Sequence, residues 1–177
     1  MSSLLNRENR IALLCQRAEK QWSDGNLGAA FKLFLAAAKA GWVPAFHIVA
    51  YFYGEGVGTK INQDASLHWY MRSYRETVSW YRNAHQTSAN NIGCIWRDRG
   101  ELKKAISWFQ RAVNLGDGDA NLNIARIYLR NGSNRRSAIH YLQKTIKAPY
   151  VTDGSIEEAK ALLKQIHAKS LRRSKVD

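Results

Sequence analysis

The stretch AFHIVAYFYG, residues 45–54, decides the fold because its spacing recurs downstream. Within it the aliphatic Val49 is followed at once by the small Ala50, and three positions later by the aromatic Tyr53. In a helix, the small residue allows a second helix to approach closely, and the aromatic ring fills the space one turn later. The same signature returns as Ile92, Gly93 and Trp96, and as Ile124, Ala125 and Tyr128.

A second pattern follows the first at each occurrence. A glycine lies four residues after the last two aromatic residues, at Gly100 and Gly132. Beyond the turn, a small residue precedes an aromatic or aliphatic pair at helical spacing. Segments of this kind begin at Ala30, Ala65, Ala105 and Ser137. The sequence therefore predicts a repeating unit of helix, glycine turn and helix.

The first unit is degenerate. Ala18 lies seven residues before Gly25, as Gly93 does before Gly100, but Arg17 and Gln21 take the other signature positions. Terminal repeats often carry polar residues at such positions because their outer face meets water.

These segments resemble the Sel-one-like repeat, a relative of the tetratricopeptide repeat. The best match runs from Ala45 to Tyr70, where residues 53–57 and 64–70 reproduce the loop and second helix of that family. The later units, from Ser88 and Ala120, are closer to the tetratricopeptide type. The resemblance covers roughly residues 10–148. It implies an all-α, right-handed helical-repeat solenoid of about four helix-turn-helix units plus a C-terminal capping helix, and a protein-binding scaffold.

We expect a single domain over residues 1–168, followed by a basic flexible tail at 169–177. The predicted units span about 7–41, 43–85, 86–116 and 118–148, and a closing helix follows at 155–168. Ser155 and Glu158 fit a capping box at the start of that helix.

The second unit contains about eleven extra residues. Within it the pair Trp69-Tyr70 is repeated as Trp80-Tyr81, eleven residues later. Eleven residues make about three helical turns, so both pairs would share one face of a long helix. Trp80 and Tyr81 either pack against the next repeat or form an exposed aromatic anchor.

The composition narrows the possible functions. The chain has 177 residues and a formal net charge of +13; residues 121–177, with twelve basic and four acidic residues, hold +8 of it. The electrostatic field of such an excess of positive charge attracts acidic proteins, nucleic acid or anionic lipid. The N-terminus lacks a signal-peptide core, and no stretch is apolar enough to span a bilayer. Two isolated cysteines suggest free thiols in a reducing compartment, so we expect a cytoplasmic protein without membrane contact.

No catalytic, cofactor-binding or metal-ligating pattern emerges. No two of the five histidines have the spacing of a metalloprotease helix, and neither Cys15 nor Cys94 carries a nucleophile signature. The glycine-rich residues 54–58 follow a helical pattern rather than a strand, which argues against a phosphate loop. We therefore predict a protein that is not an enzyme.

In arrays of this kind the first helix of each unit lines the concave surface. The resemblance therefore predicts a groove for an acidic protein or peptide, with arginine forks holding carboxylates and aromatic rings as anchors. A protein with such a groove would be an adaptor, a regulator or a toxin-neutralising immunity protein. The alternative is a nucleic-acid-binding repeat protein that uses the basic C-terminal third. The predicted partner-binding residues are His47, Tyr51, Trp80, Tyr81, Asn90, Arg97, Arg126 and Arg130.

Overall fold

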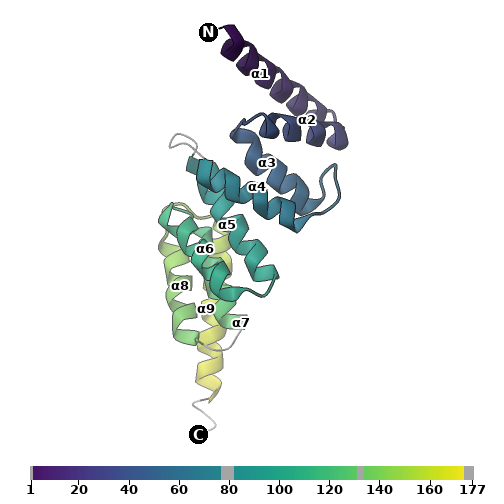
Figure 1. The fold of residues 1–177 in the computed structure, drawn as a ribbon. Helices are drawn as coiled ribbons and strands as arrows, with labels where there is room; N and C mark the ends of the chain where they lie inside the picture. Colours follow the sequence, from purple (N-terminus) through teal and green to yellow (C-terminus); the bar gives the residue numbers. More distant parts are fainter. Residues whose placement is uncertain (1, 77–81, 131–133, 174–177) are drawn as a thin grey trace. The chain divides into compact units, whose positions relative to one another are not determined.

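The computed structural model describes the backbone of residues 2–76, 82–130 and 134–173, and over these residues it contains α-helices and the turns that join them (Figure 1). The predicted all-α fold is confirmed. In chain order the helices are α1 (Ser2–Ser23), α2 (Leu27–Lys39), α3 (Pro44–Glu55), α4 (Gln63–Glu76), α5 (Arg82–Asp98), α6 (Leu102–Asn114), α7 (Asp119–Arg130), α8 (Arg135–Lys147) and α9 (Asp153–Arg173).

The predicted glycine turns join the first and second helices of two pairs. Gly25 lies two residues after the end of α1, with φ of 79°, and Gly100 two residues after the end of α5, with φ of 77°. In both turns the amide of the next residue, Asn26 or Glu101, reaches back to a carbonyl of the preceding helix. Glycine suits this position because a left-handed backbone carries no Cβ penalty there.

The backbone gathers into two compact units, residues 1–88 and 89–177, and α5 runs across the boundary. The core of the first unit is aromatic. Phe34, Phe46 and Phe52 are fully buried, and the ring of Phe31 meets that of Tyr53 edge-on at 5.0 Å between centroids. This contact joins α2 to α3 and therefore one helix pair to the next.

The small residue of the first-helix signature lies where the predicted register requires it. Ala18, Ala50 and Ala125 are fully buried, and a Cβ on Gly93 would lie 2.6 Å from the ring of Phe109. Backbones can cross this closely only where side chains are absent or minimal.

The second helices follow a stricter rule than the sequence suggested. A small buried residue is followed after four positions by a large one and after seven by another small one, which places all three on one helical face. In the second and fourth helix-turn-helix repeats the first small residue lies one position later than we inferred, at Ser66 and Ala138. The four sets are Ala30, Phe34 and Ala37; Ser66, Tyr70 and Ser73; Ala105, Phe109 and Ala112; and Ala138, Leu142 and Thr145.

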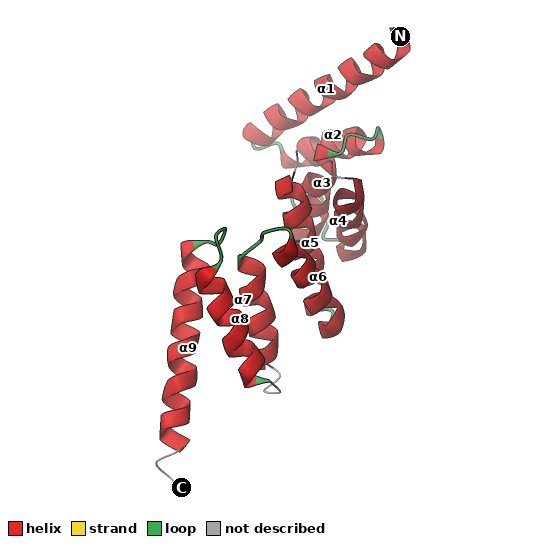
Figure 2. Ribbon diagram, turned by 90° about the vertical axis from the view of Figure 1, so that its left-hand side faces the viewer, coloured by secondary structure: helices red, strands yellow, loops and turns green. Residues whose placement is uncertain are grey.

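The closing helix α9 packs beside α7 and α8 (Figure 2). Ala159 and Ile166 of α9 join a core cluster with Leu122, Ala125 and Leu142. Ala159 follows Ala125 by 34 residues, close to the repeat length, so α9 takes the place of the first helix of a further unit. The helix is longer than the predicted 155–168, and it includes residues 169–173 of the expected tail.

The predicted N-cap of α9 is wrong. The helix begins at Asp153, and the Ser155 amide donates to the Thr152 side-chain oxygen at 3.3 Å, so Thr152 is the capping residue. Thr152 is held by Asp119, whose carboxylate accepts from both its amide and its hydroxyl, at 3.0 and 2.9 Å. Contact with the first residue of α7 thus places the capping residue three positions upstream of the predicted one.

Two predicted partner-binding residues, Trp80 and Tyr81, lie outside the described residues. The helix expected to carry both Trp-Tyr pairs is described as far as Glu76, and α5 begins at Arg82.

Candidate functional site

Four predicted residues of the second unit lie on the adjoining helices α5 and α7: Asn90, Arg97, Arg126 and Arg130. Asn123 donates its side-chain amide to Asn90 at 3.0 Å, which links α7 to α5. Arg126 donates to the side-chain oxygen of Asn123 at 3.1 Å and to both carboxylate oxygens of Glu158, at 2.9 and 2.5 Å. These hydrogen bonds therefore link α5 through α7 to α9. Asn90 and Arg126 were predicted to meet a ligand, and both already have partners within the chain.

Arg97 also has an internal partner. Its guanidinium donates to both carboxylate oxygens of the neighbouring Asp98, at 2.8 and 3.2 Å. This pair is partly exposed, since 30% of the Arg97 side chain and 65% of the Asp98 side chain remain accessible. An exposed pair of this kind gains little net energy, so the guanidinium remains free to exchange its carboxylate for another.

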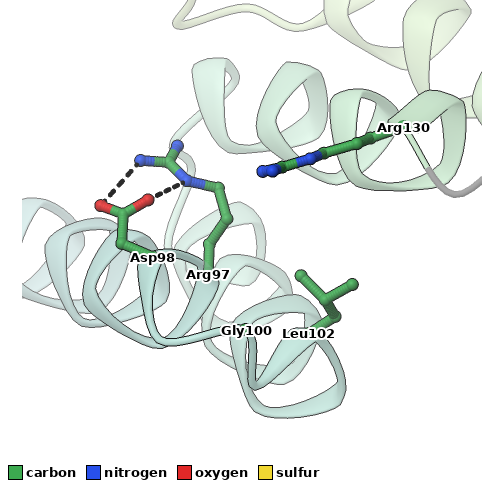
Figure 3. Close-up of a pocket in the computed structure, with 5 residues that line it drawn as sticks. All are labelled: Arg97, Asp98, Gly100, Leu102 and Arg130. Atoms are coloured by element: carbon green, nitrogen blue, oxygen red, sulfur yellow. Dashed lines mark hydrogen bonds and ion pairs between the residues drawn. The ribbon is translucent and has the colours of Figure 1, made fainter.

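Arg97 and Arg130 line one surface pocket of about 410 Å³, together with Asp98, Gly100 and Leu102. Figure 3 shows the Arg130 side chain pointing toward Arg97, whose guanidinium turns to Asp98, with Leu102 below them. Arg130 is exposed and has no ion-pair partner among the residues that the structure describes. Two guanidinium groups that share a space attract an anion into it.

The pocket also has an apolar wall that the sequence did not reveal. A smaller adjoining hollow of about 130 Å³ is lined by Leu102 and Ile127 beside Arg97, Arg126 and Arg130. Arg126 and Arg130 lie four residues apart on α7, which puts them on one face with Ile127 at its edge. The spacing of the arginines was visible in the sequence, whereas Leu102 is brought here by the turn at Gly100. The arrangement fits a carboxylate next to an aliphatic group.

The first unit holds the two remaining predicted residues. Tyr51 is 44% exposed, so its ring is available to a partner. His47 is half-buried, and this burial lowers the pKa of its imidazole, an effect that a hydrogen bond with the Pro44 backbone partly offsets. A neutral, half-buried imidazole is a poor contact for an acidic ligand.

The chemistry of the cysteines is that of buried thiols. Burial raises the pKa of the Cys15 thiol to about 11, and the nearby Glu19 adds to the rise. Burial also raises the pKa of Cys94, against the opposing effect of Arg97. Both thiols are therefore protonated near neutral pH, and thiols are weak nucleophiles in that state.

Within the described ranges, no three metal-ligating side chains come together, and no helix is both long and apolar enough to cross a membrane.

Paired helices, small residues at their crossings and glycine turns define a helical-repeat protein. No protein-family model matches the chain. Among solved structures, c5321, a protective antigen of uropathogenic Escherichia coli strains that displays an SLR fold, matches with a TM-score of 0.69 and 19% identity, over 90% of this chain and 34% of that one. MamA matches with a TM-score of 0.63 and 18% identity, over 82% of each chain.

A Sel1 repeat protein from Oxalobacter formigenes matches with a TM-score of 0.59 and 19% identity, over 79% of this chain and 59% of that one. The predicted Sel-one-like, tetratricopeptide-like repeat fold is thus confirmed. The chain spans about a third of the E. coli protein and under two thirds of the Oxalobacter protein.

Proposed function

We propose that this chain is a non-enzymatic module that binds another protein, and that an acidic segment of the partner enters the pocket formed by Arg97, Leu102 and Arg130. The observation that carries the proposal is the convergence of two arginines on a pocket in which Arg130 has no ion-pair partner among the described residues. A carboxylate of the partner would bind Arg130 and share Arg97 with Asp98. An aliphatic side chain next to it would contact Leu102 and Ile127.

The distribution of charge favours a peptide over a nucleic acid. Along this face the arginines alternate with carboxylates, since Asp98 lies beside Arg97 and Glu158 beside Arg126. A phosphate backbone carries a negative charge at every step, so these carboxylates would repel it. A peptide segment with one acidic residue needs only one free cation. The hypothesis that the basic C-terminal third binds nucleic acid is therefore the weaker one.

Capture from a native lysate of the source cells tests the proposal with three forms of the chain. These are the wild type, Arg130→Ala, and the control Arg136→Ala, which removes an equal charge from an exposed position on α8 outside the pocket. We expect an acidic protein to be retained by the wild type and the control, and its affinity for Arg130→Ala to fall about tenfold.

Each other outcome has a definite meaning. If both variants lose the partner equally, net charge rather than the pocket is responsible. Nucleic acid that leaves all three forms as salt rises, with no protein retained, would support the nucleic-acid function. A single tight partner would indicate a toxin-neutralising role, and several weaker ones an adaptor.

A further inference from the structure

A second basic groove lies in the first unit, between α1 and α2, far along the chain from the arginine pocket. It has a volume of about 570 Å³. Three of its lining residues are cations and none is acidic, whereas the rest of the lining is small, aliphatic or neutral. The lining consists of Arg17, Lys20 and Gln21 from α1 and Ala29, Lys32 and Leu33 from α2.

The repeat itself shows what such a groove holds. In each unit a second helix from the preceding pair packs against the first helix of the next. In the first unit Phe31 of α2 packs against Tyr53 of α3, with ring centroids 5.0 Å apart. In the second unit α6 packs against α7, and the Tyr141 hydroxyl of α8 also donates to Gln110 of α6 at 3.2 Å, so α6 contacts both helices of the next pair. The groove between the two helices of a pair is therefore a seat for one more helix.

The seat on α1 differs from the later ones in its chemistry. The residue just before the small signature residue is Val49 on α3 and Ile124 on α7, both fully buried, whereas on α1 it is the exposed Arg17. Two positions after the small residue lie Phe52 and Ile127, which are at most 4% exposed, whereas the same position of α1 holds the exposed Lys20. An apolar helix would leave these cations unpaired and desolvated, which is costly.

We propose that this groove receives an acidic amphipathic helix from a partner protein, seated as a preceding second helix would be. Carboxylates one turn apart on that helix would meet Arg17 and Lys32, which have no ion-pair partner among the described residues. Lys20 is 73% exposed and bound to Asp24 at 3.3 Å, a pair weak enough to exchange. Ala29 and Leu33 form a small apolar floor under the helix.

This helix seat is independent of the arginine pocket, because the two lie in different units and share no lining residue. The probe for it is a synthetic amphipathic peptide, about as long as α2, with leucines and glutamates on one helical face. A second peptide of the same composition spreads the glutamates around the helix. Fluorescence anisotropy with the full chain measures the affinity of each peptide.

The test compares two double variants of equal charge. Arg17→Glu with Lys32→Glu alters the groove, and Lys39→Glu with Lys60→Glu places the same charge at exposed positions outside it. We expect the one-faced peptide to bind the wild type and the control double variant, and to bind the groove variant at least tenfold more weakly. Arg130→Ala should leave this binding unchanged.

Equal binding of the two peptides would overturn the proposal, because it would show attraction to net charge without recognition of a helix face. Equal weakening by the two double variants would overturn it for the same reason. The milder pair Arg17→Gln with Lys32→Gln, checked by circular dichroism, separates loss of binding from loss of folding: a folded pair that binds like the wild type also contradicts the seat.

Discussion

Arg126 of α7 holds Glu158 of α9 through two hydrogen bonds from its guanidinium to the carboxylate, 2.9 and 2.5 Å long. The pair joins two helices across 32 residues of sequence, about one repeat. Asn123 orients the guanidinium from its own helix. An arginine that the sequence assigned to ligand binding therefore fastens the closing helix.

The change Glu158→Gln should lower the free energy of unfolding by roughly 0.5–1 kcal/mol at pH 7, since both side chains are more than 40% exposed. The hydrogen bonds from Arg126 lower the pKa of Glu158 below 4.5. The stabilisation is therefore complete above pH 4.5 and is lost as the pH falls through the lowered pKa. Urea unfolding at pH 7 and pH 3 measures both effects.

The matched control for this prediction is Lys160→Ala, which breaks the more exposed Glu157–Lys160 pair on the same helix. It should change stability less than Glu158→Gln does. Equal losses from the two variants would mean that the Arg126–Glu158 pair has no special role in holding α9.

The change Gly93→Ala should destabilise the second unit. A methyl group there would lie 2.6 Å from two ring carbons of Phe109, so α5 and α6 must separate or the ring must leave its place. Overpacking of this kind costs roughly 1–3 kcal/mol, more than the 0.5–1 kcal/mol that alanine gains over glycine in a helix. Thermal melts measure the difference, and the additional change Phe109→Leu should restore part of it.

The control glycine is Gly154 in α9, where an added methyl group meets nothing within 4 Å. Gly154→Ala should raise stability by roughly 0.5–1 kcal/mol. If Gly93→Ala also raised the melting temperature, the close crossing of α5 and α6 would be wrong, and with it the register of the repeat.

Acidification should weaken the first unit through His47. Burial lowers the pKa of His47 in the folded chain below 6.5, the usual value. At a pH between the lowered pKa and 6.5, the unfolded chain therefore binds more protons than the folded chain does. Stability is therefore present above pH 6.5 and lost as the pH falls. The change His47→Gln should reduce the loss in melting temperature between pH 7.5 and 5.5. His85, whose pKa burial also lowers, supplies part of the remaining dependence, and an identical dependence in the variant would exclude His47.

Both thiols should react slowly in the native protein. With a pKa of about 11, Cys15 is a thiolate in only about one molecule per thousand at pH 8. Titration with a chromogenic disulfide should therefore show slow reaction of Cys15 and Cys94 until guanidinium chloride unfolds the chain. A thiol that reacts at once in the native state would contradict its burial and would reopen the question of nucleophilic chemistry.

The fold was predictable from the sequence because close helix crossings leave so little choice of residue. At the crossings of the first helices only Ala18, Ala50, Gly93 and Ala125 occur, and such small residues at a regular spacing are visible without a structure. The second helices were harder, since Ala65 and Ser66 are both small and only burial shows that Ser66 faces the partner helix.

The residues that line the candidate pocket were easier to predict than their contacts, and binding of a partner there stays a prediction. Repeat register placed Arg97 and Arg130 near the pocket that they line. It could not show that Arg97 would turn to its sequence neighbour Asp98, because that choice depends on side-chain rotamers. It could not place Leu102 either, whose position follows from the turn before it. Glu158 was assigned to a helix cap, because local sequence does not reveal a partner 32 residues away.

The attachment of α9 has a consequence for the order in which the second unit comes apart. Its start is fastened by Thr152 to Asp119, by the Gly118 amide, which donates to the Tyr150 carbonyl at 2.7 Å, and by Glu158 to Arg126. Among the described side chains of α9, which reach Ala168, Ile166 is the last that joins the core cluster. The helix should therefore unzip from its far end toward its start, and backbone amides should exchange with solvent progressively more slowly from Ala168 toward residue 156.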